Sequence, residues 1–366
     1  MKLLQQLKDL TDELRNESLH AELKNCLTKE QLGLIYENKL FNLFVPKEYG
    51  GLDLSLPEAL QVEELLAEID GSLGWTVTLC SGANMFVGFL DQEIAPSIFR
   101  PKEVCFGGSG QASGRAEIFK EGFLVTGRWR YATGAPHNTV FTANCQIYLN
   151  GEPVLSHTNE PLIKSFFFFK EEVTVLNEWN TMGLKATASH SFEVNNLFVD
   201  KNRSFRIDPE SATLNQQIYR YPFQQFAELT LCINTLGMTT RFLDLCVPIL
   251  NARFNVRDGM ERDVVLHQYL SKAKREMADL RRLIYEVAAA TWKQLGERDS
   301  IEPSLLNEIS KYSRRLVRTA QHWVCLLYPY CGMKAANPME EINRVWRDLF
   351  TASQHSLLAV PDEFDN

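Results

Sequence analysis

The pattern of this 366-residue sequence changes twice along the chain, and the order of the patterns restricts the folds that the chain can adopt. Apolar residues recur at helical spacing up to about residue 103 and again from about residue 208. Between them lie short runs rich in Phe, Val, Thr and Trp, separated by Gly, Asn and Pro, as is typical of strands. We therefore predict an α+β, mainly α protein with a helical domain (1–103), a small β-domain (104–207) and a C-terminal helical bundle (208–366).

Local signals define some elements more closely. Leu56-Pro57-Glu58 predicts a helix start with proline in the first turn. The helix that follows has an apolar stripe and a side expected to face solvent: Val62, Leu65, Leu66 and Ile69 for the stripe, and Glu63, Glu64 and Glu68 for the exposed side. In the β-region, Asn150-Gly151 predicts a two-residue hairpin turn, because both positions tolerate positive φ.

Composition excludes several classes of function. A formal net charge of -8 argues against a nucleic-acid partner, which would need a surplus of Lys and Arg. The N-terminal 20 residues carry charge in every turn, so we expect neither a signal peptide nor a membrane partner, and a cytoplasmic location. Eight cysteines are scattered without a C-x-x-C pair or a His/Cys cluster of metal-ligand spacing, so we expect reduced thiols and no metal.

A dinucleotide-binding α/β fold is also excluded, because strands and helices do not alternate. The glycine-rich run at residues 107–110 leads into further strands and not into a helix, so we interpret it as a loop.

Four segments resemble, in order and at plausible separations, motifs of the acyl-CoA dehydrogenase superfamily. They are VPKEYGGLDLSLPEALQVEELLAEIDGSLGW (45–75), GFLVTGRWRYATGAPHNTVF (122–141), MGLKATASHSFEVNNLFVD (182–200) and NPMEEINRVWRDLFTASQH (337–355). The resemblance implies an N-terminal helical domain, a small central β-barrel or sandwich and a C-terminal four-helix bundle around one flavin, FAD or FMN. It also implies a homotetramer.

The same resemblance implies which residues lie near the flavin. Tyr131 would form a flat wall and Thr133, followed by Gly134, would donate a hydrogen bond to the ring. Thr187 and Ser189 resemble flavin-side hydroxyls, and Arg347 could contact a flavin phosphate. The residues alone allow a simpler interpretation: Trp129 and Tyr131 on one face of an ordinary strand, solvated hydroxyls, and helix-surface ion pairs of the arginines.

The C-terminal motif departs from the dehydrogenase pattern, since no carboxylate lies between Asp348 and His355. This departure, with Gly114-Arg115-Ala116, looks more like the two-component flavin monooxygenases of the superfamily. There a separate reductase supplies reduced flavin, which reacts with oxygen to hydroxylate a small organic molecule, and His355 would be the acid/base. By pattern alone, the favoured interpretation of His355 is a partly exposed histidine on a helix face.

Two other functions remain open from the sequence. The chain could oxidise an acyl-CoA thioester with a base elsewhere, for example Glu228, although Glu228 also fits a solvated helix face. Alternatively, a flavin-free protein could keep the fold for binding or assembly.

Overall fold

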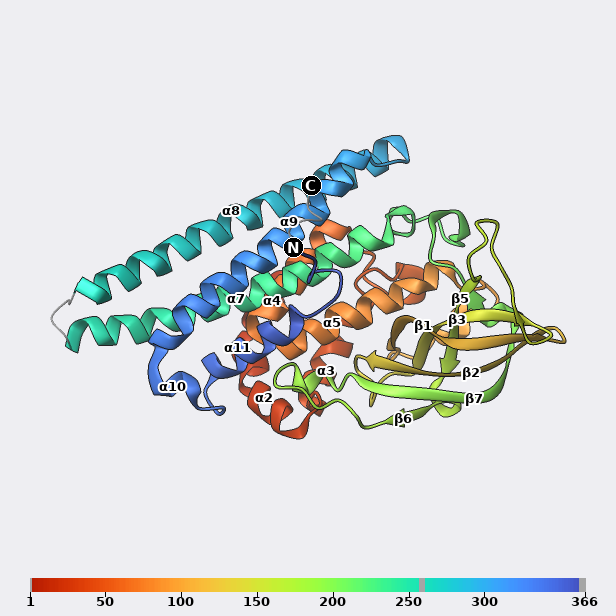
Figure 1. The fold of residues 1–366 in the computed structure, drawn as a ribbon, viewed down its shortest axis with the longest axis horizontal. Coiled ribbons are helices and arrows are strands. Elements are labelled where there is room, and N and C mark those ends of the chain that lie inside the picture. The colour runs from red at the N-terminus through yellow and green to blue at the C-terminus, as the bar shows by residue number, and fades with distance from the viewer. Residues whose placement is uncertain (1, 257–260, 362–366) are drawn as a thin grey trace.

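The computed structural model describes residues 2–256 and 261–361. The N-terminal part consists of α1 (Lys2–Asp9), α2 (Thr11–Lys24), α3 (Lys29–Glu37), α4 (Leu56–Ile69), α5 (Gly71–Asn84) and α6 (Ala95–Ile98). The strands are β1 (Phe106–Phe119), β2 (Gly122–Ala132), β3 (Val140–Leu149), β4 (Glu152–Pro153), β5 (Ile163–Phe169), β6 (Thr174–Leu176), β7 (His190–Asp200) and β8 (Ser204–Phe205). The helices α7 (Phe223–Val256), α8 (Glu261–Arg298), α9 (Pro303–Leu327), α10 (Gly332–Ala336) and α11 (Glu341–Ala352) follow (Figure 1).

Helix α4 begins where the sequence predicts. Ser55 caps it in a capping box with Glu58, and Pro57 lies in the first turn, where its missing N–H costs nothing. The helix packs against both α5 and α7, so it is covered on more than one side. The prediction that Glu63 and Glu64 face solvent is therefore wrong: both are buried.

The two glutamates are accommodated differently. Glu64 accepts hydrogen bonds from Arg281 (2.6 Å) and Tyr285 (2.6 Å) of α8. Within residues 2–256 and 261–361, Glu63 accepts only a long hydrogen bond from Ser81 (3.4 Å), and its Oε2 is buried without a partner. Burial therefore raises the pKa of Glu63 well above its usual value.

We predict that Glu63→Gln stabilises the protein at neutral pH. A carboxyl whose folded pKa is raised loses stability as pH rises above the unfolded value of about 4.3, and the loss is complete above the folded pKa. We expect the free energy of unfolding at pH 7 to rise by about 1–3 kcal/mol in the variant. The gain in the free energy of unfolding should vanish near pH 4. Urea unfolding at several pH values would measure this dependence. The exposed Glu286→Gln serves as control; an equal gain there, or a pH-independent gain at Glu63, would contradict the argument.

The strands form one sheet in the order β6-β7-β2-β1-β3-β5-β8, with β4 paired to β3. All pairs are antiparallel except β1 with β3. The sheet curls around a hydrophobic core of its own: β2 and β5 are separated by two strands, yet the rings of Trp129 and Phe168 lie 5.8 Å apart. Trp129 also stacks on Phe192 of β7 at 5.2 Å. Aromatic side chains such as Trp129, Phe168 and Phe192 thus fill the interior of a small β-domain.

Two sequence predictions about this sheet have different outcomes. The hairpin at Asn150-Gly151 is confirmed, with φ of 53° and 86° and β3 paired to β4. The interpretation of residues 107–110 as a loop is wrong, because they belong to β1, and Gly107, Gly108 and Ser109 pair with β3. Glycine is required there by crowding: a Cβ on Gly108 would lie 2.1 Å from the Thr142 carbonyl oxygen.

Helix α7 lies at the centre of the helical part. It packs against α8, α9 and α11 of the bundle and against α4 and α5 of the N-terminal part. Figure 1 shows α7, α8 and α9 as long helices side by side, with the β-domain at one end of the molecule. In the described part of the chain, no helix is both long and apolar enough to cross a membrane.

Candidate active site

A cavity of about 290 Å³ lies where the three parts of the fold meet. It is bounded by α5, by strands β1, β3, β5 and β8, by α7 and by the segment that follows α11. Its lining residues are Thr78, Leu79, Gly82, Ala83, Phe86, Gly107, Gly108, Ser109, Gly110, Thr133, Thr142, Ala143, Asn144, Ser165, Phe205, Ile207, Phe223, Phe226, Ala227, Thr230, Leu231, His355 and Leu357. The volume is at the lower end of the range of about 300–1,000 Å³ for small-molecule sites.

The lining combines flat apolar walls with uncharged polar groups. Four phenylalanines contribute rings: Phe86, Phe205, Phe223 and Phe226. The polar groups are hydroxyls, one asparagine amide and one imidazole, so His355 is the only ionisable side chain among the described residues of the lining. Such a surface suits an uncharged planar molecule that is oriented by a few hydrogen bonds.

A chain of hydroxyl groups runs from the cavity wall into the protein. Thr187 Oγ1 donates to the Leu184 carbonyl (2.8 Å), Ser189 Oγ lies 2.7 Å from Thr187 Oγ1, and Thr133 Oγ1 lies 2.9 Å from Ser189 Oγ. Because each hydroxyl has one proton, the first bond fixes the rest: Ser189 donates to Thr187, and Thr133 donates to Ser189. A cavity group that bonds the Thr133 hydroxyl must therefore be a donor.

This arrangement brings together three of the residues proposed from the sequence, and it makes Thr133 a hydrogen-bond acceptor toward the cavity. Thr133, Thr187 and Ser189 form one buried network and not a solvated strand surface. Gly134 adjoins it: its N–H donates to the Thr187 carbonyl (2.8 Å), and its φ of 74° favours glycine. Thr133, expected to donate to the ring, is placed by its own hydrogen bond to accept.

His355 reaches the cavity from the turn that follows α11. Its Nδ1 accepts a hydrogen bond from the Leu357 N–H (3.3 Å), so the neutral ring carries its proton on Nε2. Its ring centre lies 6.2 Å from that of Trp75. Burial lowers the pKa of His355, which keeps the ring neutral at neutral pH. The nitrogen available to a ligand is thus an N–H donor, while action as a base first requires the Leu357 hydrogen bond to break.

Tyr131 is not in the cavity lining. The pairing of β2 with β7 shifts register between Trp129 and Ala132, and Tyr131 has a φ of 69°. This bulge turns the tyrosine away from the face that buries Trp129, leaving it 56% exposed with its edge against Trp179 (6.2 Å). The alternative interpretation, in which Trp129 and Tyr131 share one face, is therefore wrong.

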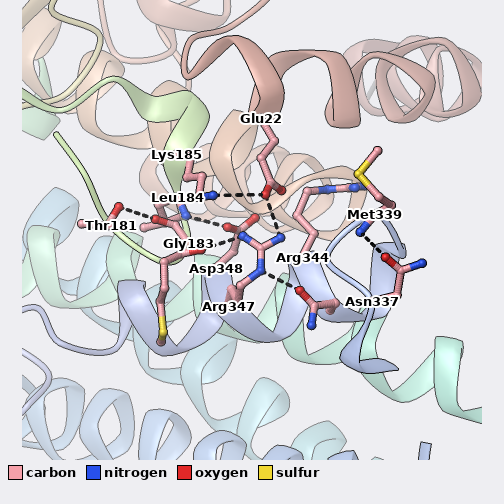
Figure 2. Close-up of polar contacts among 12 residues, drawn as sticks. Glu22, Thr181, Gly183, Leu184, Lys185, Asn337, Met339, Arg344, Arg347 and Asp348 are labelled. Atoms are coloured by element: carbon pink, nitrogen blue, oxygen red, sulfur yellow. Dashed lines mark hydrogen bonds and ion pairs between the residues drawn. The ribbon is translucent and has the colours of Figure 1, made fainter. Parts of the chain in front are cut away.

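Arg347 is engaged inside the protein (Figure 2). Its guanidinium donates to the Met182 carbonyl (2.6 Å) and to Asn343 Oδ1 (2.7 Å), and it forms an ion pair with Glu22 of α2 (2.7 Å). The neighbouring Asp348 accepts a hydrogen bond from the Leu184 N–H (2.5 Å). The R-x-x-R-D helix thus connects the bundle to α2 and to the loop before β7, and Arg347 is absent from the cavity lining.

Glu228, the candidate base for thioester oxidation, lies inside the bundle. It is fully buried, so the expectation of a solvated helix face is wrong. Its carboxylate accepts a hydrogen bond from Ser310 (2.5 Å) and lies 3.5 Å from Arg314, both on α9. The adjacent Ala227 lines the cavity, whereas Glu228 does not.

Comparisons with known proteins show which family and which solved structures the chain resembles. Residues 229–360 match the family model described as "Acyl-CoA dehydrogenase, C-terminal domain". The structure superposes on the crystal structure of the HsaA monooxygenase from Mycobacterium tuberculosis with a TM-score of 0.90 at 19% identity, covering 98% of this chain and 94% of that one. Residues 229–360 thus resemble the C-terminal domain of acyl-CoA dehydrogenases, and the whole chain has the fold of the HsaA monooxygenase.

Two further similar proteins are informative. The indole-3-acetate monooxygenase of Acinetobacter baumannii is 20% identical over 358 residues, which cover 96% of this chain and 90% of the relative. The structure of XiaF from Streptomyces sp., in complex with FADH2 and glycerol, has a TM-score of 0.86 at 19% identity and covers 98% of this chain and 91% of that one. The superfamily fold predicted from the four motifs is therefore confirmed.

Proposed function

We propose that this protein is the oxygenase component of a two-component flavin-dependent monooxygenase. It would use reduced flavin, delivered by a separate reductase, and oxygen to hydroxylate a small uncharged organic substrate. The names of the relatives support this branch of the superfamily.

The observation that carries the proposal is the chemistry of the cavity. Oxidation of a thioester at Cα requires a base beside the substrate, and the dehydrogenases of the superfamily use a glutamate. No carboxylate lines this cavity within the described residues. Glu228, the base proposed from the sequence, instead accepts a hydrogen bond from Ser310 of α9. The cavity instead offers a neutral imidazole, which suits a hydroxylation that needs a hydrogen-bond donor near neutral pH.

The residues present fit a flavin ring. Phenylalanine side chains supply flat apolar walls, the backbone of β1 at Gly107 and Gly108 forms one boundary, and Thr133 and His355 supply hydrogen bonds. When bound in reduced form, flavin would supply the electrons for oxygen activation. The chain's own contribution is to exclude water with apolar walls, to hold a proton at His355 Nε2 and to present an acceptor at Thr133 Oγ1.

The function is tested by mixing the full chain with a flavin reductase, NADH, flavin and a panel of uncharged aromatic compounds. We expect oxygen consumption that depends on both the chain and the reductase, and a product that gains one atom from isotopically labelled oxygen gas. Bleaching of bound flavin by an acyl-CoA under anaerobic conditions would instead show dehydrogenation. Failure of the chain to bind flavin in either redox state would favour the flavin-free alternative.

We predict that Ser189→Ala weakens the preference for reduced over oxidised flavin. Reduced flavin carries an N–H at N5 that can donate to Thr133, whereas oxidised N5 only accepts. Without Ser189, the Thr133 hydroxyl is free to rotate and donate into the cavity. The ratio of the two affinities should fall about five- to thirtyfold, the equivalent of about 1–2 kcal/mol for one hydrogen bond. Anaerobic and aerobic titrations measure it, with the exposed Ser113→Ala as control; an unchanged ratio at Ser189 would rule out this role.

The oligomeric state and the location in the cell are also proposals. A homotetramer is implied by the superfamily, and α8 exposes Val264 and Tyr269, whose apolar surface a second copy could cover. Light scattering of the purified protein would measure the number of chains. A cytoplasmic location rests on the N-terminal sequence and would be tested by fractionation of cells.

A further inference from the structure

Three side chains with metal-binding chemistry meet behind the cavity wall, although they are far apart in the sequence. Cys80 is on α5, Cys105 directly precedes β1, and His137 follows β2. One ligand atom of each lies within 4.8 Å of the other two. Both cysteines are buried, and Phe41 stacks on the imidazole with ring centres 5.5 Å apart and an angle of 9°. The proposed function uses none of the three.

His137 provides the observation that points to a ligand. Its Nε2 is buried and has no hydrogen-bond partner among the described residues. Buried ring nitrogens are nearly always bonded, and an unbonded one requires an explanation. Burial also lowers the pKa of His137 to about 4, so the ring is neutral at neutral pH and keeps a lone pair for a metal ion.

The surroundings suit a borderline-soft divalent ion better than a hard one. Two cysteines and a histidine are the ligands that zinc prefers, with bonds of about 2.3 Å to sulfur and about 2.0–2.1 Å to nitrogen. The ligand atoms of such a site lie about 3.5–3.8 Å apart, so a small contraction of the present cluster would complete it. Two thiolates would cancel the charge of the ion, which a buried site requires.

An oxygen atom that could serve as a fourth metal ligand also lies close to the cluster. The Cys105 thiol donates to Asn138 Oδ1 at 3.3 Å, and the Cys80 thiol lies 3.7 Å from the Thr133 carbonyl. Burial raises the pKa of Cys105 well above its usual value, so zinc would have to displace this proton on binding.

We propose that Cys80, Cys105 and His137 form a zinc site, with the Asn138 side chain as the fourth ligand. The ion would tie α5 to the start of β1 and to the loop after β2. The ligands lie close to residues that line the cavity: Leu79 precedes Cys80, Gly107 lies two positions after Cys105, and the Thr133 carbonyl contacts the Cys80 thiol. The site would therefore fix one wall of the cavity. Its role is structural and separate from the proposed reaction.

The first test is the zinc content of the full-length wild-type protein, purified without chelators from zinc-supplemented culture and measured by plasma mass spectrometry. We expect about one equivalent per chain. Replacing zinc by cobalt should give the intense near-ultraviolet absorption of thiolate-bound cobalt. A wild-type protein that holds no zinc after loading and shows no such absorption would overturn the proposal, whatever the variants do.

The second test locates the site. Cys80→Ser and Cys105→Ser should each lose at least about tenfold in zinc affinity and abolish the cobalt band, while the exposed Cys325→Ser should behave as wild type. Removing zinc from the wild type with a chelator should lower its melting temperature, and added zinc should restore it. Zinc retained in both variants would overturn the assignment, as would a Cys80–Cys105 disulfide in the freshly purified protein. None of these readouts depends on flavin or on turnover, so they stand apart from the test of the proposed function.

Discussion

His355→Ala is expected to lower hydroxylation turnover by about 10²–10⁴-fold, the usual contribution of a positioned acid or base. His355 is the only ionisable side chain among the described residues of the cavity lining, so no neighbour can replace it. The loss should appear in kcat more than in the affinity for reduced flavin. Single-turnover reactions of reduced enzyme with oxygen and substrate would separate the two.

The pH profile gives a second measurement of the same role. Burial lowers the pKa of His355, so the neutral ring is present at neutral pH and is lost as pH falls through this lowered value. The wild-type rate should therefore fall on the acid side, below the usual histidine value of about 6.5. His355→Gln keeps a hydrogen-bond donor but cannot titrate, so its slower rate should lack this acid limb.

A matched control is available in His20, an exposed histidine of α2. His20→Ala should leave both rate and pH profile unchanged. If His355→Ala turned over at the wild-type rate, His355 would have no part in the reaction, and the proton would have to be held by the substrate or by water.

The order of the elements could be predicted from the sequence because local patterns determine it. The helix start at Pro57 and the turn at Asn150-Gly151 each depend only on residues that are close in the sequence. The fold could also be predicted, since four motifs in order restrict the fold far more than one does, and the solved structure of the HsaA monooxygenase has the same fold.

The burial of the two glutamates of α4 could not be predicted from local sequence patterns. Glu63 and Glu64 lie on the polar side of an amphipathic pattern, but α4 packs on several sides, and Ser81, Arg281 and Tyr285 reach them from other helices. Helical periodicity describes one buried stripe and cannot show a second covering helix.

The candidate site shows the same limit. Thr133 and His355 were found through the resemblance, whereas the phenylalanines of the cavity wall, for example Phe86 and Phe226, carry no local signal. Tyr131 has the expected spacing in the motif, but a bulge that only strand pairing reveals directs it away from the cavity. Roles for these residues at a flavin remain predictions.

Arg347→Ala is expected to lower the free energy of unfolding by about 3 kcal/mol, the lower end of the range for a broken buried ion pair, because buried Glu22 keeps only Lys185, at 3.8 Å, as a charged partner. The loss would be large because Arg347 joins three parts of the chain: α11, α2 and the Met182 carbonyl before β7. Urea unfolding measures it, with the exposed Arg282→Ala as control, where the change should stay within about 1 kcal/mol.

The same variant decides between the two roles considered for this arginine. A flavin-phosphate contact predicts weaker binding of reduced flavin with little change in stability. The ion pair predicts the reverse, and also that Glu22→Ala and Arg347→Ala are not additive, since removing both partners leaves no unpaired charge. A double-mutant cycle should therefore give a coupling energy of at least about 1 kcal/mol. Additive losses combined with a tenfold weaker affinity for reduced flavin would assign Arg347 to the cofactor instead.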